Sequence, residues 1–150
     1  GLPIGAVVAD ERACDVFHPG DHGTTFGGNP VACAGGYAAL SRIAEDSFLE
    51  QVRQKGERLR SALLEMEEVE GVDGMGLMLG VRLKNQTSAG VLSKCIQKGL
   101  LPLTAKEKLR LLPPLTITEE ELSRGIAILK QVLSGAPGSD TSNTTGGNEP

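Results

Sequence analysis

Small residues and hydroxyl side chains are concentrated in one short stretch of the sequence, HGTTFGGNP at residues 22–30. Thr24 and Thr25 supply hydroxyl donors, and the glycines around them let a ligand approach the backbone N–H groups closely. Asn29 and Pro30 suit the N-cap and first position of a helix, whose N-terminus carries partial positive charge. These features predict an anion site, and phosphate is the commonest biological anion for such a site.

Two well-known phosphate-binding patterns do not fit this stretch. No G-K-[ST] follows the glycines, as a Walker A loop requires, and the G-x-G-x-x-G spacing of a dinucleotide site is absent. A tight structural turn, with hydroxyls that cap nearby backbone groups, therefore stays open as the alternative to a phosphate site.

The histidines and cysteines do not predict a metal centre. His18 and His22 are four residues apart, but Pro19 and Gly20 between them disfavour a helix that would bring the imidazoles together. The cysteines are odd in number and widely spaced, which argues against a disulfide framework or a zinc site and favours a reducing compartment. They are Cys14, Cys33 and Cys95.

The composition suits one globular domain or a piece of a larger protein. Apolar residues make up 39% of the 150, and only three Phe and one Tyr are present, so a core must consist of Leu, Val, Ile and Ala. The net charge of −4, with both signs interleaved, gives no basic patch for nucleic acid. No apolar run reaches the roughly 20 residues of a membrane span, and no secretory signal pattern is present.

Hydrophobic periodicity predicts the elements that position these residues. An apolar run at 4–9 predicts a buried strand, and a long loop at 10–29 then leads into an Ala-rich helix from Pro30. A second helix is predicted from Phe48, with an apolar stripe spaced by three and four. That stripe comprises Val52, Gly56, Leu59, Leu63 and Met66.

The C-terminal half alternates between strand and helix patterns. Residues 76–83 predict a strand with one buried face, and residues 88–98 predict a helix that stops at Gly99. Extended runs follow around Leu101 and Arg110, before a final helix.

The start of that final helix has a complete capping signature. Thr118 is the expected N-cap, Glu121 completes a capping box, and Ile117 and Leu122 are placed for a hydrophobic staple. The polar segment 134–150 contains almost no apolar residues, which predicts a disordered tail.

Four segments, in this order and spacing, resemble the class III pyridoxal-phosphate aminotransferases. The resemblance covers roughly residues 1–133 and implies an α/β fold, the C-terminal part of an aspartate-aminotransferase-type (fold type I) structure. Residues 1–35 would end the large cofactor domain, and 36–133 would form a linking helix and the small domain. The segments are GLPIGAVVA (1–9), HGTTFGGNP (22–30), GLMLGVRL (76–83) and LRLLPPLTITEEEL (109–122).

The resemblance also implies the cofactor, the partners and the site residues. It implies pyridoxal 5'-phosphate, a cytoplasmic homodimer, and active sites at the subunit interface. Thr25, with Thr24 and Gly23, would bind the cofactor phosphate in the partner's site. Arg110 would hold a substrate carboxylate, for which a guanidinium is well shaped; a solvated arginine on a strand is the alternative.

Substrates follow from the resemblance as well. Family members that transfer an amino group between N-acetylornithine and 2-oxoglutarate, forming glutamate in arginine biosynthesis, match this sequence best. Members that act on ornithine, succinylornithine or 4-aminobutyrate share the loop and are the alternatives.

The chain departs from the family pattern in two respects. The lysine that forms the Schiff base is expected a few residues before Gly1, so no lysine here receives a catalytic role and the chain alone is expected to be inactive. A non-catalytic module that kept only this part is the competing hypothesis. Asp73 and Met75 stand where relatives tend to have basic residues.

Overall fold

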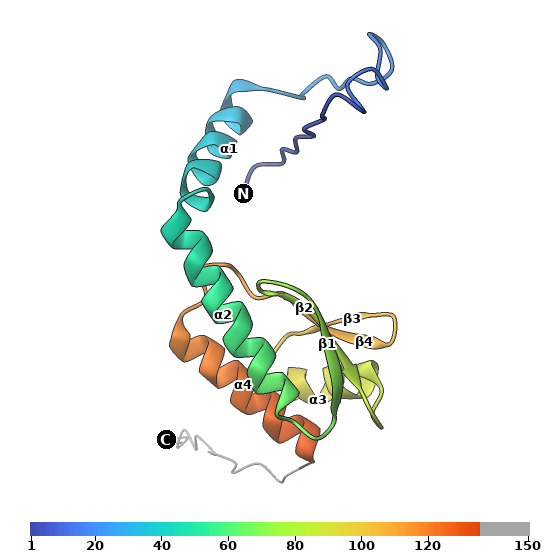
Figure 1. Cartoon of the computed structure of the whole chain (residues 1–150), viewed down its shortest axis with the longest axis vertical. Coiled ribbons are helices and arrows are strands. Elements are labelled where there is room, and N and C mark those ends of the chain that lie inside the picture. The colour runs from blue at the N-terminus through green and yellow to red at the C-terminus, as the bar shows by residue number, and fades with distance from the viewer. Residues whose placement is uncertain (136–150) are drawn as a thin grey trace, which may run out of the picture. The chain divides into compact units, whose positions relative to one another are not determined.

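The computed structural model describes residues 1–135, and the chain divides into two compact units (Figure 1). The first unit comprises residues 1–49 and the second begins at Glu50, so the boundary falls inside the second helix. The domain division predicted after residue 35 stays a prediction. Of the predicted disordered tail, residues 136–150 lie outside the described residues, whereas Ser134 ends a helix and Gly135 is its C-cap.

The first unit contains a long irregular segment and helix α1 (Pro30–Ile43). The predicted buried strand at 4–9 is wrong, because these residues form no strand and Val8 is 96% exposed. A strand needs a neighbour for its backbone hydrogen bonds, and no strand within residues 1–135 pairs with this segment. Only Leu2 and Ile4 find partial cover, where they approach Gly35 and Gly36 of α1.

The second unit is built on a four-stranded sheet in the order β1-β2-β4-β3, with every neighbouring pair antiparallel (Figure 1). Strand β2 confirms the alternation predicted for residues 76–83, although Leu77 is buried from the hairpin turn rather than from the strand. The strands are β1 (Val69–Met75), β2 (Met78–Leu83), β3 (Leu103–Ala105) and β4 (Lys108–Leu111).

Helices α2 (Asp46–Leu64), α3 (Ser88–Gln97) and α4 (Glu119–Ser134) contribute to one hydrophobic core with one face of this sheet. The predicted stripe of α2 is confirmed, since Gly56, Leu59 and Leu63 are its buried residues. The buried residues of α4 are Leu122, Leu129, Val132 and Leu133. Fully buried side chains form the centre of the core: Leu63, Leu77, Leu79, Val81, Val91, Cys95 and Leu109.

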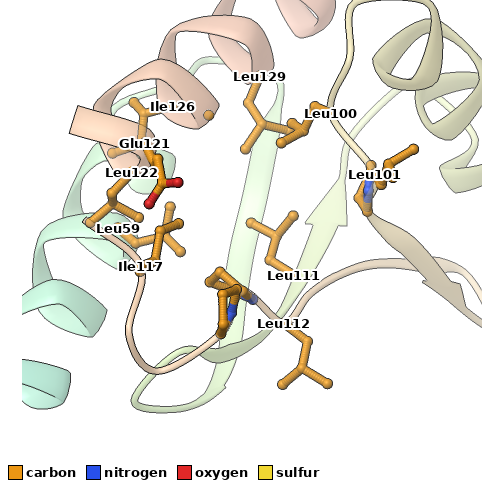
Figure 2. Close-up of a pocket in the computed structure, with 14 residues that line it drawn as sticks. Leu59, Leu100, Leu101, Leu111, Leu112, Ile117, Glu121, Leu122, Ile126 and Leu129 are labelled. Carbon is orange, nitrogen blue, oxygen red and sulfur yellow. The ribbon is translucent and has the colours of Figure 1, made fainter. Parts of the chain in front are cut away.

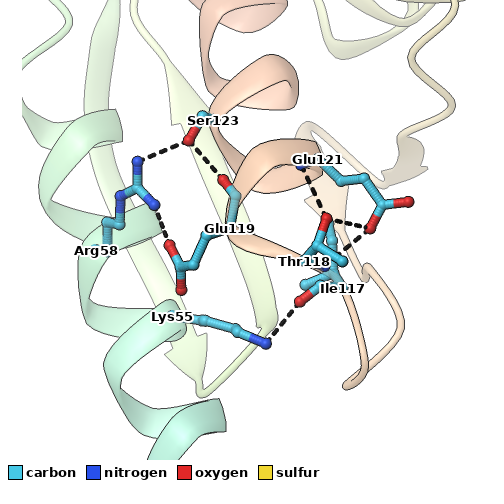
Figure 3. A network of polar contacts seen from close by, with 7 residues as sticks. All are labelled: Lys55, Arg58, Ile117, Thr118, Glu119, Glu121 and Ser123. Carbon is cyan, nitrogen blue, oxygen red and sulfur yellow. Dashed lines mark hydrogen bonds and ion pairs between the residues drawn. The ribbon is translucent and has the colours of Figure 1, made fainter.

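Polar contacts fix the start of α4 against α2 (Figure 3). The Lys55 ammonium donates to the carbonyl of Ile117 at 2.6 Å. Arg58 donates to the Ser123 hydroxyl at 2.8 Å and forms an ion pair with Glu119. Because both donors come from successive turns of α2, they set the position at which α4 begins.

The capping box predicted for α4 is confirmed in full. The Glu121 backbone N–H donates to the Thr118 hydroxyl, and the Thr118 N–H donates to the Glu121 carboxylate at 2.8 Å (Figure 3). The hydrogen bond from the Thr118 N–H, followed by one that the Thr118 hydroxyl donates to the same carboxylate at 2.8 Å, lowers the pKa of Glu121 from its usual value.

Candidate functional site

The predicted site residues lie in different units. Gly23, Thr24 and Thr25 belong to the first unit, whereas Arg110 lies on β4 in the second.

The loop at residues 22–30 is anchored to α1 by one side chain. Asn29 is the N-cap, as predicted, and its Oδ1 accepts the Ala32 N–H at 2.9 Å. The Asn29 Nδ2 donates back to the Phe26 carbonyl at 3.0 Å. Because Pro30 has no N–H and Ala32 is already paired, the helix N-terminus keeps few free donors for a ligand.

The hydroxyls and glycine N–H groups of this loop are the donors left for an anion. Thr24 and Thr25 are exposed, and neither hydroxyl is hydrogen-bonded to another described residue. The Thr24 Oγ1 lies against Gly27, where an added Cβ would approach it to 2.5 Å. Gly27 thus leaves the Thr24 hydroxyl free of a clashing side chain, and the loop offers neutral donors of the kind that a phosphate ester accepts.

Charge, however, is missing from the loop itself. Residues 22–30 contain neither Lys nor Arg. Apart from His22, the donors of this segment are hydroxyl and amide groups, which orient an anion without neutralising it, so most of the counter-charge of a dianionic phosphate would come from outside the segment.

Arg110 lies on the face of the sheet that the helices leave uncovered. It pairs in register with Gly80 on β2 and Leu103 on β3, while its neighbours Leu109 and Leu111 point into the core. The Arg110 Nε is buried and has no hydrogen-bond partner among the described residues. A buried guanidinium nitrogen without a partner is costly unless a ligand completes it, so this arginine is suited to bind a carboxylate.

A second charged group on the same face was not predicted from the sequence. Asp73 on β1 accepts a hydrogen bond from the Lys108 Nζ at 2.7 Å and forms an ion pair with Arg82. The hydrogen bond from Lys108, followed by that from Arg82, lowers the pKa of Asp73 from 3.8 to about 2. From the sequence, Asp73 was noted only as a departure from the family pattern. Its partners lie on other strands, and no pattern of neighbouring residues predicts those contacts.

Two glycines lie beneath the side chains of Arg82 and Lys108. A Cβ at Gly71 would collide with the Arg82 guanidinium nitrogen Nη2, and a Cβ at Gly80 would lie 3.3 Å from the Lys108 side chain. Lys108 therefore crosses β2 over Gly80 to reach Asp73 on β1.

One pocket of the second unit is apolar (Figure 2). It has a volume of about 300 Å³ and is lined mainly by Leu, Ile and Pro side chains, including Leu100, Leu111 and Ile126. Its only ionisable lining residue is Glu121, whose carboxylate already accepts hydrogen bonds from Thr118. The lining of this pocket is therefore almost entirely apolar packing surface, with the Glu121 carboxylate as its one charged group.

The remaining reactive side chains form no centre in the described part of the chain. No group of three or more His, Cys, Asp or Glu residues among residues 1–135 could hold a metal ion. Cys14 and Cys33 are exposed, whereas Cys95 is buried and its thiol pKa is raised by desolvation. Within the same residues, no helix combines the length and apolar character needed to cross a membrane.

Comparison with known proteins gives the family. The family model of the class-III aminotransferases matches residues 1–133. The chain belongs to the class-III aminotransferases. The resemblance found in the sequence is thereby confirmed, together with the predicted α/β fold as part of an aspartate-aminotransferase-type structure.

Curated class-III relatives share much of this sequence. The chain is 47% identical over 135 residues to the acetylornithine aminotransferase of Haemophilus ducreyi, a match that covers 89% of this chain and 34% of that protein. It is 43% identical over 139 residues to the acetylornithine aminotransferase of Caldanaerobacter subterraneus, with 89% and 35% covered. The chain thus spans about a third of the length of these relatives.

Solved class-III structures share the fold. The acetylornithine aminotransferase of Elizabethkingia anophelis matches with a TM-score of 0.68 at 34% identity, covering 81% of this chain and 34% of that one. The ornithine δ-aminotransferase of Plasmodium falciparum matches with a TM-score of 0.70 at 30% identity, covering 85% and 35%.

Proposed function

We propose that this chain is the C-terminal portion of an acetylornithine aminotransferase, which transfers an amino group between N-acetylornithine and 2-oxoglutarate in arginine biosynthesis. The names and identities of the curated relatives support the substrate, and the partnerless guanidinium of Arg110 is the observation that carries the chemistry. Residues 1–35 would end the large domain, and 36–133 would form the linking helix and small domain. The enzyme would act in the cytoplasm.

In this proposal the loop of the first unit holds the cofactor phosphate. Pyridoxal 5'-phosphate, when bound, supplies the electron sink that amino transfer needs. Thr25 would donate its hydroxyl to the phosphate, with Thr24 and Gly23 completing the donor set. The exposure of these three residues within their own chain supports a site shared across a homodimer interface. The missing counter-charge and the lysine that carries the cofactor would come from segments outside residues 1–150.

Arg110 would bind a carboxylate of the substrate. Two parallel N–H groups of a guanidinium match the two oxygens of a carboxylate, and such charge-assisted hydrogen bonds are about twice as strong as neutral ones. The sheet fixes the arginine on both sides, because β4 pairs with both β2 and β3. The rigid backbone would orient the substrate for amino transfer.

Replacement of Thr25 tests the cofactor role. In the intact protein, produced from its whole gene, Thr25→Ala should weaken retention of pyridoxal phosphate roughly tenfold, the effect of losing one hydrogen bond to a charged group. Thr25→Ser keeps the hydroxyl and should retain the cofactor nearly as well as the wild type. Cofactor retention is measured by equilibrium dialysis. Equal retention by the wild type and Thr25→Ala would refute the role.

The similarity to ornithine aminotransferase structures supports ornithine as a second candidate substrate. Turnover by the intact protein of N-acetylornithine and of ornithine, each with 2-oxoglutarate, separates the two. A preference for N-acetylornithine of at least about a hundredfold in kcat/KM is expected. A preference for ornithine would favour assignment of the protein as an ornithine aminotransferase instead.

The competing hypothesis of a non-catalytic module is tested on the 150-residue chain alone. We expect that chain to show neither transaminase activity nor the visible absorbance of a lysine-bound cofactor. The decisive comparison is with the intact protein, which should show both. If the intact protein shows neither the transaminase activity nor the visible absorbance, the hypothesis of a non-catalytic module is favoured.

A further inference from the structure

Three cationic side chains occupy the uncovered face of the sheet, and they differ in whether a carboxylate pairs with them. Arg82 and Lys108 both interact with Asp73. Arg110 takes part in no ion pair among the described residues, and its Nε has no hydrogen-bond partner. One carboxylate therefore engages two of the cations and leaves the third available.

Register puts these groups close together. Asp73 is directly opposite Gly80, and Gly80 is directly opposite Arg110, so the three form a row across β1, β2 and β4. Asp73 and Arg110 are then separated by two strand spacings, about 10 Å between their Cα atoms. Lys108, two residues before Arg110 on β4, extends over Gly80 to end at the Asp73 end of this row.

We propose that Asp73 is a specificity-determining residue for anion binding at Arg110. By engaging Arg82 and Lys108, it makes binding depend on direct contact with one guanidinium rather than on a general excess of positive charge. The inference rests on the proposed function, in which Arg110 binds a substrate carboxylate. Asp73 touches neither substrate nor cofactor in this role and acts only through its two partners.

The charge of this group determines whether anion binding at Arg110 becomes tighter or weaker. The group Asp73, Arg82 and Lys108 carries a net charge of +1 (−1 + 1 + 1), and removal of the aspartate charge makes it +2. A dicarboxylate about 10 Å away should then bind about threefold more tightly, within the range expected for one added charge near a protein surface. The gain should vanish in about 1 M salt, where the Debye length is about 3 Å.

The test uses binding of glutarate, a dicarboxylate without the reactive oxo group, to the intact cofactor-loaded protein by titration calorimetry. Asp73→Asn should bind glutarate about threefold more tightly than the wild type at low salt. The double variant Asp73→Asn with Lys108→Gln restores the group's charge to +1 and should bind like the wild type. A purely structural role for Asp73 predicts no such restoration.

A further variant keeps the test decisive if Asp73→Asn fails to fold. Lys108→Gln alone leaves the Asp73–Arg82 pair and lowers the net charge to zero, so glutarate should bind about threefold more weakly. Circular dichroism verifies the fold of each variant. Unchanged glutarate affinity in Lys108→Gln, or a double variant that binds as tightly as Asp73→Asn, overturns the proposal.

Arg110→Lys separates failure of this inference from failure of the proposed function. If Arg110→Lys weakens glutarate binding at least tenfold while Asp73→Asn changes nothing, only the role of Asp73 is refuted. If Arg110→Lys binds glutarate like the wild type, the carboxylate role of Arg110 is refuted, and the inference about Asp73 falls with it.

Discussion

Residues 1–49 and residues 50–135 use their apolar side chains in opposite ways. The second unit buries Leu63, Val81 and Leu109 completely in one core. In the first unit Ala32 is the only buried hydrophobic residue, while large apolar side chains are exposed. These include Val7, Val8, Phe17, Phe26, Val31, Tyr37 and Leu40.

This difference bears on how each part of the proposed site is held. Arg110 is fixed by strands that rest on a core of their own, so its position is a property of the second unit. The loop with Thr25 belongs to a unit that exposes many large apolar side chains and buries only Ala32. Exposed apolar patches commonly mark interaction sites, so we expect this loop to be held less firmly than Arg110 unless another surface covers the unit.

Hydrogen exchange of the 150-residue chain should show the largest contrast. The amide of Val81 in β2 lies in the core sheet and should be protected about a thousandfold or more, because it exchanges only through extensive unfolding. The amide of Val7 forms no strand hydrogen bond and should exchange almost freely. Mass spectrometry of peptides covering 77–83 and 4–9 measures both. Equal exchange rates in the two peptides would contradict the comparison.

Truncation of leucines should give the next largest contrast. Leu63 is fully buried, and Leu63→Ala should lower the free energy of unfolding by about 3 kcal/mol. Leu40 in α1 is 64% exposed, and the matched change Leu40→Ala should cost less than about 0.5 kcal/mol. Urea denaturation followed by circular dichroism gives both values. A similar loss at both sites would mean that α1 shares a core that the structure does not have.

Local sequence signals predicted much of the second unit. The stripe of α2, the alternation of β2 and the capping box at Thr118 depend on residues within a few positions of one another. Strand β1 had no such signal. A bulge between Val69 and Gly71 turns Val69 and Val72 to the same face although they are three residues apart, so the period of two is hidden.

The rest of the candidate site depends on contacts far apart in the sequence. Arg110 and Thr25 were predicted as site residues only through the resemblance to a family. An arginine on a strand or a threonine in a loop is too common to indicate a site by itself. The ion pair of Asp73 with Lys108 joins residues 35 positions apart across an intervening strand, and no sequence pattern encodes it. The strand predicted at 4–9 failed for a related reason, because apolar character without a neighbouring strand does not make a sheet.

A close approach within the second unit allows a smaller and more local test. An added Cβ at Gly56 of α2 would lie 2.5 Å from the Gly76 carbonyl oxygen, so Gly56→Ala should destabilise the unit by about 2 kcal/mol. Gly125 of α4 is the matched control, since its nearest neighbour would be a Leu100 methyl at 3.7 Å. Gly125→Ala should therefore be neutral or stabilise by up to about 1 kcal/mol. Equal destabilisation by both variants would show that helix geometry, and not the contact with Gly76, sets the cost.

The smallest expected effect is the dependence of the second unit's stability on acid. Because the folded pKa of Asp73 is lowered to about 2 from 3.8, its stabilisation is complete above about pH 3.8 and is lost as the pH falls toward 2. Asp73→Asn should therefore be less stable than the wild type at pH 5, and the two should converge near pH 2. Urea midpoints at both pH values measure this, with Glu65→Gln, an exposed carboxylate, as the charge control. A gap between wild type and Asp73→Asn that persists unchanged to pH 2 would mean that packing, and not the ion pairs with Lys108 and Arg82, makes Asp73 stabilising.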